Sequence, residues 1–281
     1  MRNLILSGLF TMAVVGGCVG SQGASQVGHS GGPQAEPEGI DAVFSHPSPD
    51  SIPGGQRGEQ IRLGYQLVVD TQEFASSYVG NGLTCANCHL DAGLDPNAAS
   101  FVGLSKVYPE YQARAGRVLT LADRINDCVV RSLNGKAIPE DSHKLYAMVA
   151  YIEWLSKDVP EGSRMGWRGI PRLAAVKSPN PSSGAKLYTA RCAFCHGADG
   201  QGTMAAPPLW GDRAFSIGSD MARLPVAASF IKSNMPRTRG WALSDQDAYD
   251  VAAYLNARPR PDFAGKGGDW PKGGKPSDVS Y

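Results

Sequence analysis

Two short stretches of the chain repeat the same arrangement of cysteine and histidine. Both read Cys-x-x-Cys-His, first at residues 85–89 and again at residues 192–196. Two thiols at this spacing can add to the two vinyl groups of a haem, and the adjacent histidine can ligate the iron. The repeat therefore predicts two covalently bound haem c groups, attached through Cys85, Cys88, His89, Cys192, Cys195 and His196.

The alternative for one such motif is a zinc or redox Cys-x-x-Cys site followed by a chance histidine. A structural zinc site needs four ligands, and the sequence offers no further Cys-x-x-Cys or His-x-His cluster. Two copies of the motif in one exported chain therefore favour haem.

Each motif histidine fills one axial position of its iron, so the other face needs a ligand of its own. In the first half, residues 120–133 read as a helix that Thr120 caps, and Arg124, Cys128 and Ser132 recur every four residues along it. Cys128 is thus a candidate metal ligand, whose thiolate would lower the haem potential. The alternative is a small buried hydrophobic residue beside solvated arginines.

The second half offers Met204, Met221, Lys232 and Met235 as distal ligands. Met235 is favoured, because Asn234-Met235-Pro236 resembles the methionine loop of many small cytochromes c, and Lys232 is the second choice. A thioether ligand raises the haem potential. Electrons should then pass from the thiolate haem to the methionine haem.

The elements that position these residues are helices. A helical run precedes each motif, and Gly64 and Gly184 occupy corresponding positions in the two runs. Each half also closes with a helix, capped by Ser142 in the first and by Ser244 in the second. No strand pattern of useful length is present, so the predicted fold is all-α, with two cytochrome c-type haem domains in tandem. We expect them at residues 46–160 and 184–262, with a linker at 161–183 and a C-terminal tail at 263–281.

The N-terminus predicts export. Residues 1–17 combine a charged start with a short apolar stretch, as in a signal peptide, and end at a lipobox-like Val-Gly-Gly-Cys. Cys18 would be acylated, with residues 18–45 as lipid anchor and flexible tether, on the periplasmic side of a bacterial membrane. Ordinary cleavage, which would leave a soluble periplasmic protein, is the alternative.

Charge and cysteine counts narrow the function. The chain has 27 Lys and Arg against 26 Asp and Glu, a net charge of +1 that argues against nucleic acid as a partner. Of its 6 cysteines, four belong to the haem motifs and one to the lipid site. Cys128 therefore has no disulfide partner, although the predicted compartment is oxidising.

The motifs and the residues between them resemble the dihaem thiosulfate dehydrogenases over roughly residues 47–261. The pattern of Arg114, Arg124, Cys128 and Ser132 between the two motifs is the specific part of the resemblance. The resemblance implies oxidation of two thiosulfates to tetrathionate, sometimes reversed. It also implies that Cys128 is the iron ligand and sulfur-reactive group, that Arg114, Arg124 and Ser132 bind the anion, and that a soluble or membrane cytochrome c accepts the electrons.

One feature departs from the family. Some members place Lys and Met side by side at the second haem, whereas Ser233-Asn234 separates Lys232 from Met235 here. Ligand exchange between the two is therefore in doubt.

Three other functions compete with this interpretation. A non-catalytic dihaem electron-transfer cytochrome would explain the haems but not Cys128 or the arginines. The dihaem subunit of the multi-enzyme thiosulfate oxidation system carries its reactive cysteine in the C-terminal haem domain, where this chain has none outside the motif. A dihaem peroxidase would need a distal histidine, and His29, His46 and His143 lie at positions typical of surface residues.

Overall fold

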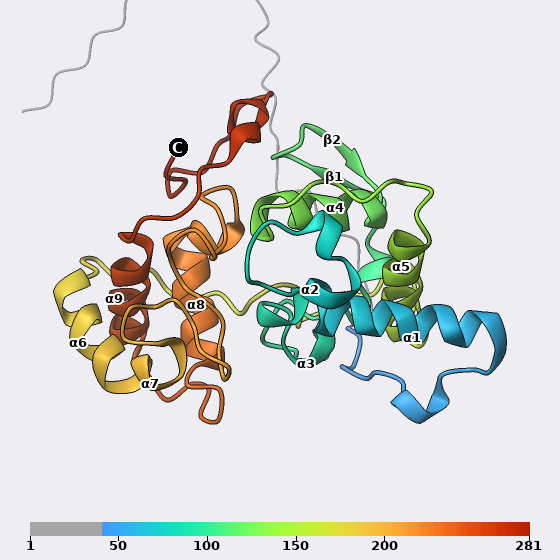
Figure 1. The fold of residues 1–281 in the computed structure, drawn as a ribbon, viewed down its shortest axis with the longest axis horizontal. Helices are drawn as coiled ribbons and strands as arrows, with labels where there is room; N and C mark the ends of the chain where they lie inside the picture. Colours follow the sequence, from blue (N-terminus) through green and yellow to red (C-terminus); the bar gives the residue numbers. More distant parts are fainter. Residues whose placement is uncertain (1–40) are drawn as a thin grey trace, which may run out of the picture. The chain divides into compact units, whose positions relative to one another are not determined.

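The computed structural model describes residues 41–281, so the predicted signal peptide and the acylation of Cys18 lie outside the described residues. Within the described range no helix is long and apolar enough to cross a bilayer. Helices dominate this part of the chain (Figure 1). The α-helices are α1 (Gly55–Val69), α2 (Thr71–Phe74), α3 (Leu90–Gly93), α4 (Leu121–Ser132), α5 (His143–Leu155), α6 (Pro181–Arg191), α7 (Ala193–His196), α8 (Leu224–Asn234) and α9 (Asp245–Asn256). The short 3₁₀ helices are η1 (Pro49–Ser51), η2 (Ser76–Tyr78), η3 (Cys85–Asn87), η4 (Leu104–Lys106), η5 (Asp220–Ala222) and η6 (Ala264–Gly268).

A matching pair of helix crossings organises the two halves. Helix α1 packs against α5, and α6 packs against α9. A Cβ added at Gly64 would lie 2.1 Å from the carbonyl oxygen of Ala147, and one added at Gly184 would lie 2.0 Å from that of Asp250. Because only glycine permits so close an approach of two backbones, the corresponding glycines fix the corresponding crossings.

Helix caps set the positions of the helices that close each half. The Ser142 side chain accepts a hydrogen bond from the backbone N–H of Lys144 at the start of α5. At the start of α9, Ser244 and Asp247 form a reciprocal capping box. The capped helices predicted from the sequence are confirmed, because these local hydrogen bonds need no distant partner.

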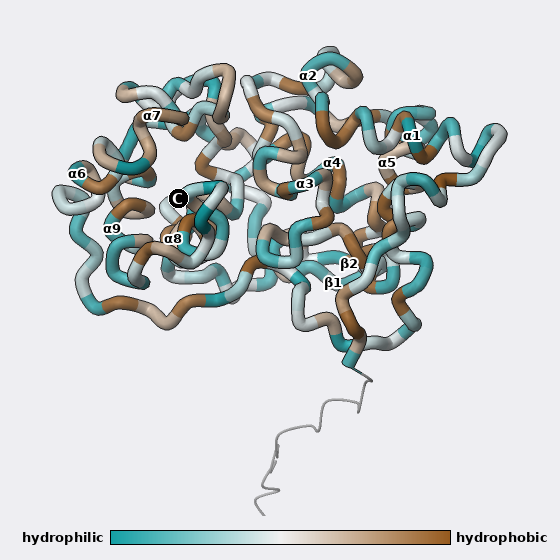
Figure 2. Tube along the Cα trace, turned by 90° about the horizontal axis from the view of Figure 1, so that it is seen from below, coloured by the Kyte–Doolittle hydropathy of each residue, from teal (hydrophilic) through white to brown (hydrophobic). Residues whose placement is uncertain are grey.

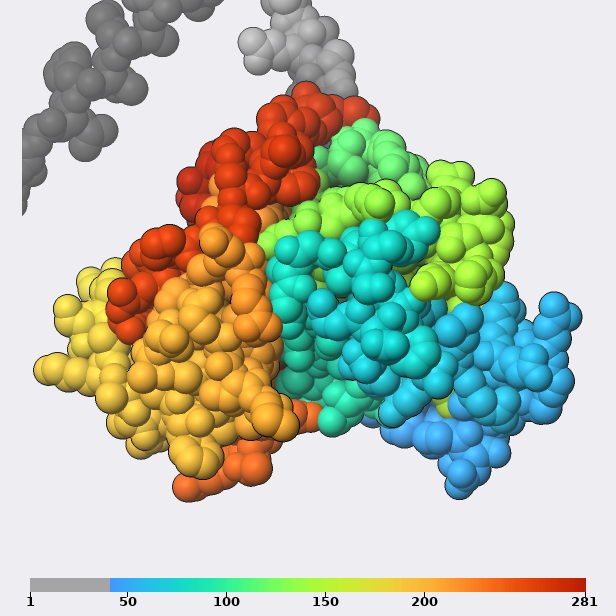
Figure 3. Space-filling model, viewed as in Figure 1, coloured from blue at the N-terminus to red at the C-terminus, as the bar shows by residue number. Residues whose placement is uncertain are grey.

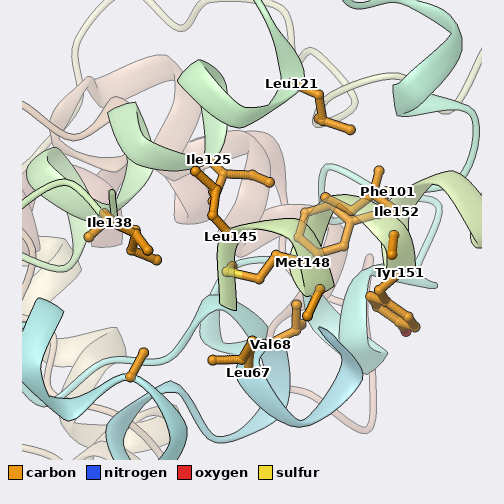
Figure 4. Packing of buried hydrophobic residues seen from close by; sticks show 14 of the residues in the cluster. Leu67, Val68, Phe101, Leu121, Ile125, Ile138, Leu145, Met148, Tyr151 and Ile152 are labelled. Carbon is orange, nitrogen blue, oxygen red and sulfur yellow. The ribbon is translucent and has the colours of Figure 1, made fainter. Parts of the chain in front are cut away.

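Two main clusters of buried apolar residues form the core. The larger joins residues of α1, α4 and α5, among them Leu67, Ile125 and Leu145 (Figure 4). The smaller joins Tyr188 of α6 with residues of α8 and α9. Along α1 and α4 hydrophobic and hydrophilic residues are interspersed, as expected of helices with one buried face (Figure 2).

A short β-hairpin is the part of the fold that the all-helical prediction missed. Strand β1 (Glu110–Gln112) pairs antiparallel with β2 (Arg117–Leu119), so that Tyr111 lies opposite Val118. Three-residue strands are too short to show a period of two in the sequence. The hairpin matters because its turn carries Arg114.

The C-terminal segment, residues 263–281, folds back onto the first half of the chain. The backbone N–H of Trp270 donates to the carbonyl oxygen of Arg114 at 2.8 Å. Figure 3 shows this segment, in red, against the green region that holds the hairpin and α4. The segment predicted as a tail is thus part of the folded molecule.

Candidate active site

In the first Cys-x-x-Cys-His motif, both the backbone and the sulfur of Cys85 contact one hydroxyl group. The backbone N–H of Cys85 donates to the hydroxyl oxygen of Thr71 at 3.1 Å, and that hydroxyl lies 3.5 Å from the Cys85 sulfur. Burial raises the pKa of Cys85 to about 11 and that of Cys88 to about 12. Both thiols are therefore half-buried in surroundings that disfavour the charged thiolate.

The two motif histidines are oriented alike. The Nδ1 atom of His89 lies 2.7 Å from the carbonyl oxygen of Ala99, and that of His196 lies 2.9 Å from the carbonyl oxygen of Pro207. A histidine held through Nδ1 presents Nε2 to a metal. Two thiols and an oriented imidazole in each half fit the attachment and proximal ligation of a haem c.

Helix α4 brings its row of polar residues to the first motif. The negative charge of a Cys128 thiolate contributes to the raised pKa values of Cys85 and Cys88, after burial. Burial lowers the pKa of His89 to about 4, and the positive charge of Arg124 adds to this effect. Cys128 and Arg124 therefore lie within electrostatic reach of the motif. Burial also raises the pKa of Cys128 itself, against the opposing effect of Arg124.

Two of the three predicted anion contacts, Arg114 and Arg124, line a pocket of about 250 Å³. Arg114 reaches it from the hairpin turn and Arg124 from α4. Ser132, at the end of α4, instead makes a 2.9 Å contact between its hydroxyl and that of Ser219. The pocket is lined by Gln112, Ala113, Arg114, Ala115, Leu119, Arg124, Asp127, Asp220, Arg223, Trp270 and Pro276.

The arginines belong to a closed circuit of ion pairs, which we call the arginine–aspartate ring. In order around the circuit its members are Arg114, Asp220, Arg124, Asp127, Arg131 and Asp269, with Asp269 returning to Arg114. The Nη1 atom of Arg124 lies 2.7 Å from Asp127, and the Nε atom of Arg131 lies 2.5 Å from the same carboxylate. Both are helical neighbours, so the sequence spacing could have revealed them.

The remaining ring members could not be found from spacing. Asp220 and Asp269 lie 106 and 138 positions from the arginines with which they form hydrogen bonds. Arg114 also stacks on Trp270, with its guanidinium carbon 4.8 Å from the ring centroid. Arg223, a further pocket residue, forms a two-pronged pair with Asp278 at 2.8 and 2.9 Å.

The candidate ligands of the second half lie in different surroundings. Met235 follows the last residue of α8 and packs against the cluster that Cys192 also contacts. The Lys232 ammonium donates to the carbonyl oxygen of Leu243 at 2.5 Å and pairs with Asp245 at 3.0 Å. The Lys232 ammonium group is thus already bound by Leu243 and Asp245.

The other candidates of the second half have separate roles. Met204 is fully exposed. Met221 packs between the larger core cluster and a small cluster around Phe230. The Asn234 amide donates to the carbonyl oxygen of Asn97 at 3.1 Å, which ties the end of α8, just before Met235, to the first half.

Comparison with known proteins matches both halves to cytochrome domains. Residues 71–160 match the SoxA/TsdA cytochrome c domain, and residues 179–255 match cytochrome C oxidase, cbb3-type, subunit III. These matches support covalent haem c and the tandem of two cytochrome c domains predicted from the sequence.

The chain is similar to whole proteins as well. It is 44% identical to a thiosulfate dehydrogenase of Allochromatium vinosum, over 79% of this chain and 86% of that protein. The solved thiosulfate dehydrogenase TsdBA of Marichromatium purpuratum superposes with a TM-score of 0.73 at 39% identity, covering 78% of this chain and 50% of that one. A thiosulfate dehydrogenase electron acceptor of Stutzerimonas stutzeri is 36% identical over 35% of this chain and 50% of that protein.

Proposed function

The chain belongs to the thiosulfate dehydrogenase family, and on that premise we propose that it joins two thiosulfate ions into tetrathionate in the pocket beside α4. One sulfur–sulfur bond forms, two electrons leave, and no proton is exchanged. Two haem c groups, one attached at each motif, would accept one electron each. The same chemistry can run in reverse.

Cys128 is the residue on which this proposal depends. Together with His89 it would hold the first iron, and its sulfur would be the one that the substrate meets. The observation that carries the proposal is that the Cys128 thiol and the Arg124 guanidinium lie in one row on α4, within electrostatic reach of the first motif, and that Arg124 also lines the pocket. A carrier of electrons alone has no use for such a row.

Arg114, Arg124 and Ser132 would bind the anions. Two thiosulfate ions repel each other because each carries two negative charges. Guanidinium groups and a hydroxyl donor offset that repulsion and hold the reacting sulfurs in line.

Met235 would be the distal ligand of the second iron and would give it the higher potential. The contacts of Lys232 with Leu243 and Asp245 favour Met235 over Lys232. Electrons would then leave to a soluble or membrane cytochrome c. The thiosulfate dehydrogenase electron acceptor of Stutzerimonas stutzeri supports a separate protein as the electron acceptor.

The site of action would be the periplasmic side of a bacterial membrane, with Cys18 acylated as the anchor. Membrane fractionation of cells that express the full chain or its Cys18→Ser variant tests this assignment. Only the unaltered chain should sediment with membranes, and equal sedimentation of both would contradict acylation.

The Cys128→Ala and Cys128→Gly variants test the enzymatic proposal. Both haems should stay attached, whereas thiosulfate-dependent tetrathionate formation with an artificial acceptor should be lost. The thiolate signature should also disappear from the electron paramagnetic resonance spectrum. Retained turnover in either variant would contradict the mechanism, and a wild-type protein whose haems thiosulfate does not reduce would be an electron carrier.

A further inference from the structure

Ser219 and Asp220, in the second half of the chain, contact the three side chains proposed to bind substrate in the first half. The Ser219 hydroxyl lies 2.9 Å from that of Ser132. One carboxylate oxygen of Asp220 lies 3.0 Å from Nη1 of Arg114, and the other lies 3.6 Å from Nη2 of Arg124. A single dipeptide, 219–220, therefore meets all three proposed contacts.

The arginine–aspartate ring carries no net charge, since three guanidinium groups face three carboxylates. A neutral ring attracts a dianion weakly, because each positive charge is already matched. Withdrawal of one carboxylate would therefore strengthen the binding of thiosulfate between Arg114 and Arg124.

Asp220 is the carboxylate that withdraws most easily. Its side chain is 45% exposed, against 20% for Asp127 and 4% for Asp269. It meets each of its arginines through one contact, and the contact with Arg124 is the longest in the ring. Because Asp220 is the most exposed carboxylate of the ring, its exchange for another anion should cost less than that of Asp127 or Asp269.

We propose that Asp220 is a built-in competing anion that thiosulfate displaces, and that it sets the affinity of the pocket and its preference for doubly charged anions. A carboxylate offers one negative charge between Arg114 and Arg124, whereas thiosulfate offers two. The inference rests on the proposed function, because it takes these arginines as substrate contacts.

The Asp220→Asn variant tests the proposal, since it keeps the shape of the side chain and removes its charge. The KM for thiosulfate should fall roughly two- to fivefold, as expected for loss of one exposed competing charge. Sulfate, used as a competitive probe, should inhibit at correspondingly lower concentration, and kcat and the haem spectra should match the wild type. The control is Asp262→Asn, which removes an exposed carboxylate that pairs with Lys266 outside the ring and should leave KM unchanged.

The Asp220→Glu variant provides a second measurement if the amide variant folds poorly. It retains the charge on a longer arm, so its KM should not fall below that of the wild type. An Asp220→Asn variant with unchanged or raised KM would overturn the proposal and would make Asp220 a positioning residue for the arginines. A fall in KM for Asp220→Glu would overturn it as well.

The Arg124→Gln variant separates the role proposed for Asp220 from the proposed function on which it rests. A raised KM in Arg124→Gln together with an unchanged KM in Asp220→Asn refutes only the competing anion. An unchanged KM in Arg124→Gln refutes the anion contacts of the proposed function, and the role of Asp220 fails with them.

Discussion

Removal of the negative charge of Asp269 should release the C-terminal segment from the first half. The two carboxylate oxygens of Asp269 lie 2.6 and 2.8 Å from the two terminal nitrogens of Arg131, and the Tyr281 hydroxyl donates to the carboxylate at 2.5 Å. The Asp269 and Arg131 side chains are only 4% and 9% exposed. Burial would raise the pKa of Asp269, but the hydrogen bonds from Arg131 and Tyr281 outweigh that effect and lower it.

The magnitude follows from the burial of the pair. Loss of one partner of a buried ion pair costs about 3–5 kcal/mol, because the other charge stays buried without compensation. In Asp269→Asn the amide oxygen still accepts one hydrogen bond, and Asp127 still pairs with Arg131. We therefore expect the lower end, a loss of about 3 kcal/mol in the free energy of unfolding.

Guanidinium chloride unfolding of the haem-loaded protein measures this loss, and limited proteolysis reports release of residues 263–281. The matched control is Asp262→Asn, a charge removal just before the same segment at an exposed site, which should leave the unfolding midpoint unchanged. An Asp269→Asn variant as stable as this control would refute the assignment of the buried pair as the anchor.

Two further predictions concern the first half. Gly64→Ala should lower the free energy of unfolding by about 2 kcal/mol, since its new methyl group would lie 2.1 Å from the Ala147 carbonyl oxygen. Chemical denaturation measures this loss, and an unchanged midpoint would contradict the close crossing of α1 and α5. The hydrogen bond from Arg117 and those from Thr120 lower the pKa of Asp123 from its ordinary 3.8 to about 2. The carboxylate therefore stabilises the fold fully above about pH 4 and loses that effect as the pH falls through 2, so the stability difference between wild type and Asp123→Asn should be about 1 kcal/mol at pH 6 and vanish near pH 2.

Local patterns revealed the elements and the haem chemistry. The cap at Thr120 begins α4, and the four-residue spacing of Arg124, Cys128 and Ser132 places them in one row on it. Both features depend on residues within a few positions of each other, where the geometry of a helix determines which side chains lie close together. The Cys-x-x-Cys-His motifs are local in the same sense. A single sequence therefore suffices for them.

The surroundings of that row could not be predicted, because they come from distant parts of the chain. Nothing near Asp220 or Asp269 indicates that they will form hydrogen bonds with Arg114 and Arg131, 106 and 138 positions away. The hairpin that presents Arg114 was missed for a different reason, since its strands are too short to show their period. The sequence thus identifies the positive groups of the site but not the carboxylates that balance them.

Those distant carboxylates make the second half part of the first half's site. Asp220 begins η5, Leu224 begins α8 two residues after η5 ends, and α8 leads directly to Met235. An α-helix of 11 residues is about 16 Å long and resists bending, so α8 acts as a stiff spacer. The hydrogen bond from Asn234 to Asn97 fixes the far end of α8 against the first half. The segment that contacts the proposed anion site and the residue proposed to ligate the second iron are therefore held at a set separation by one helix.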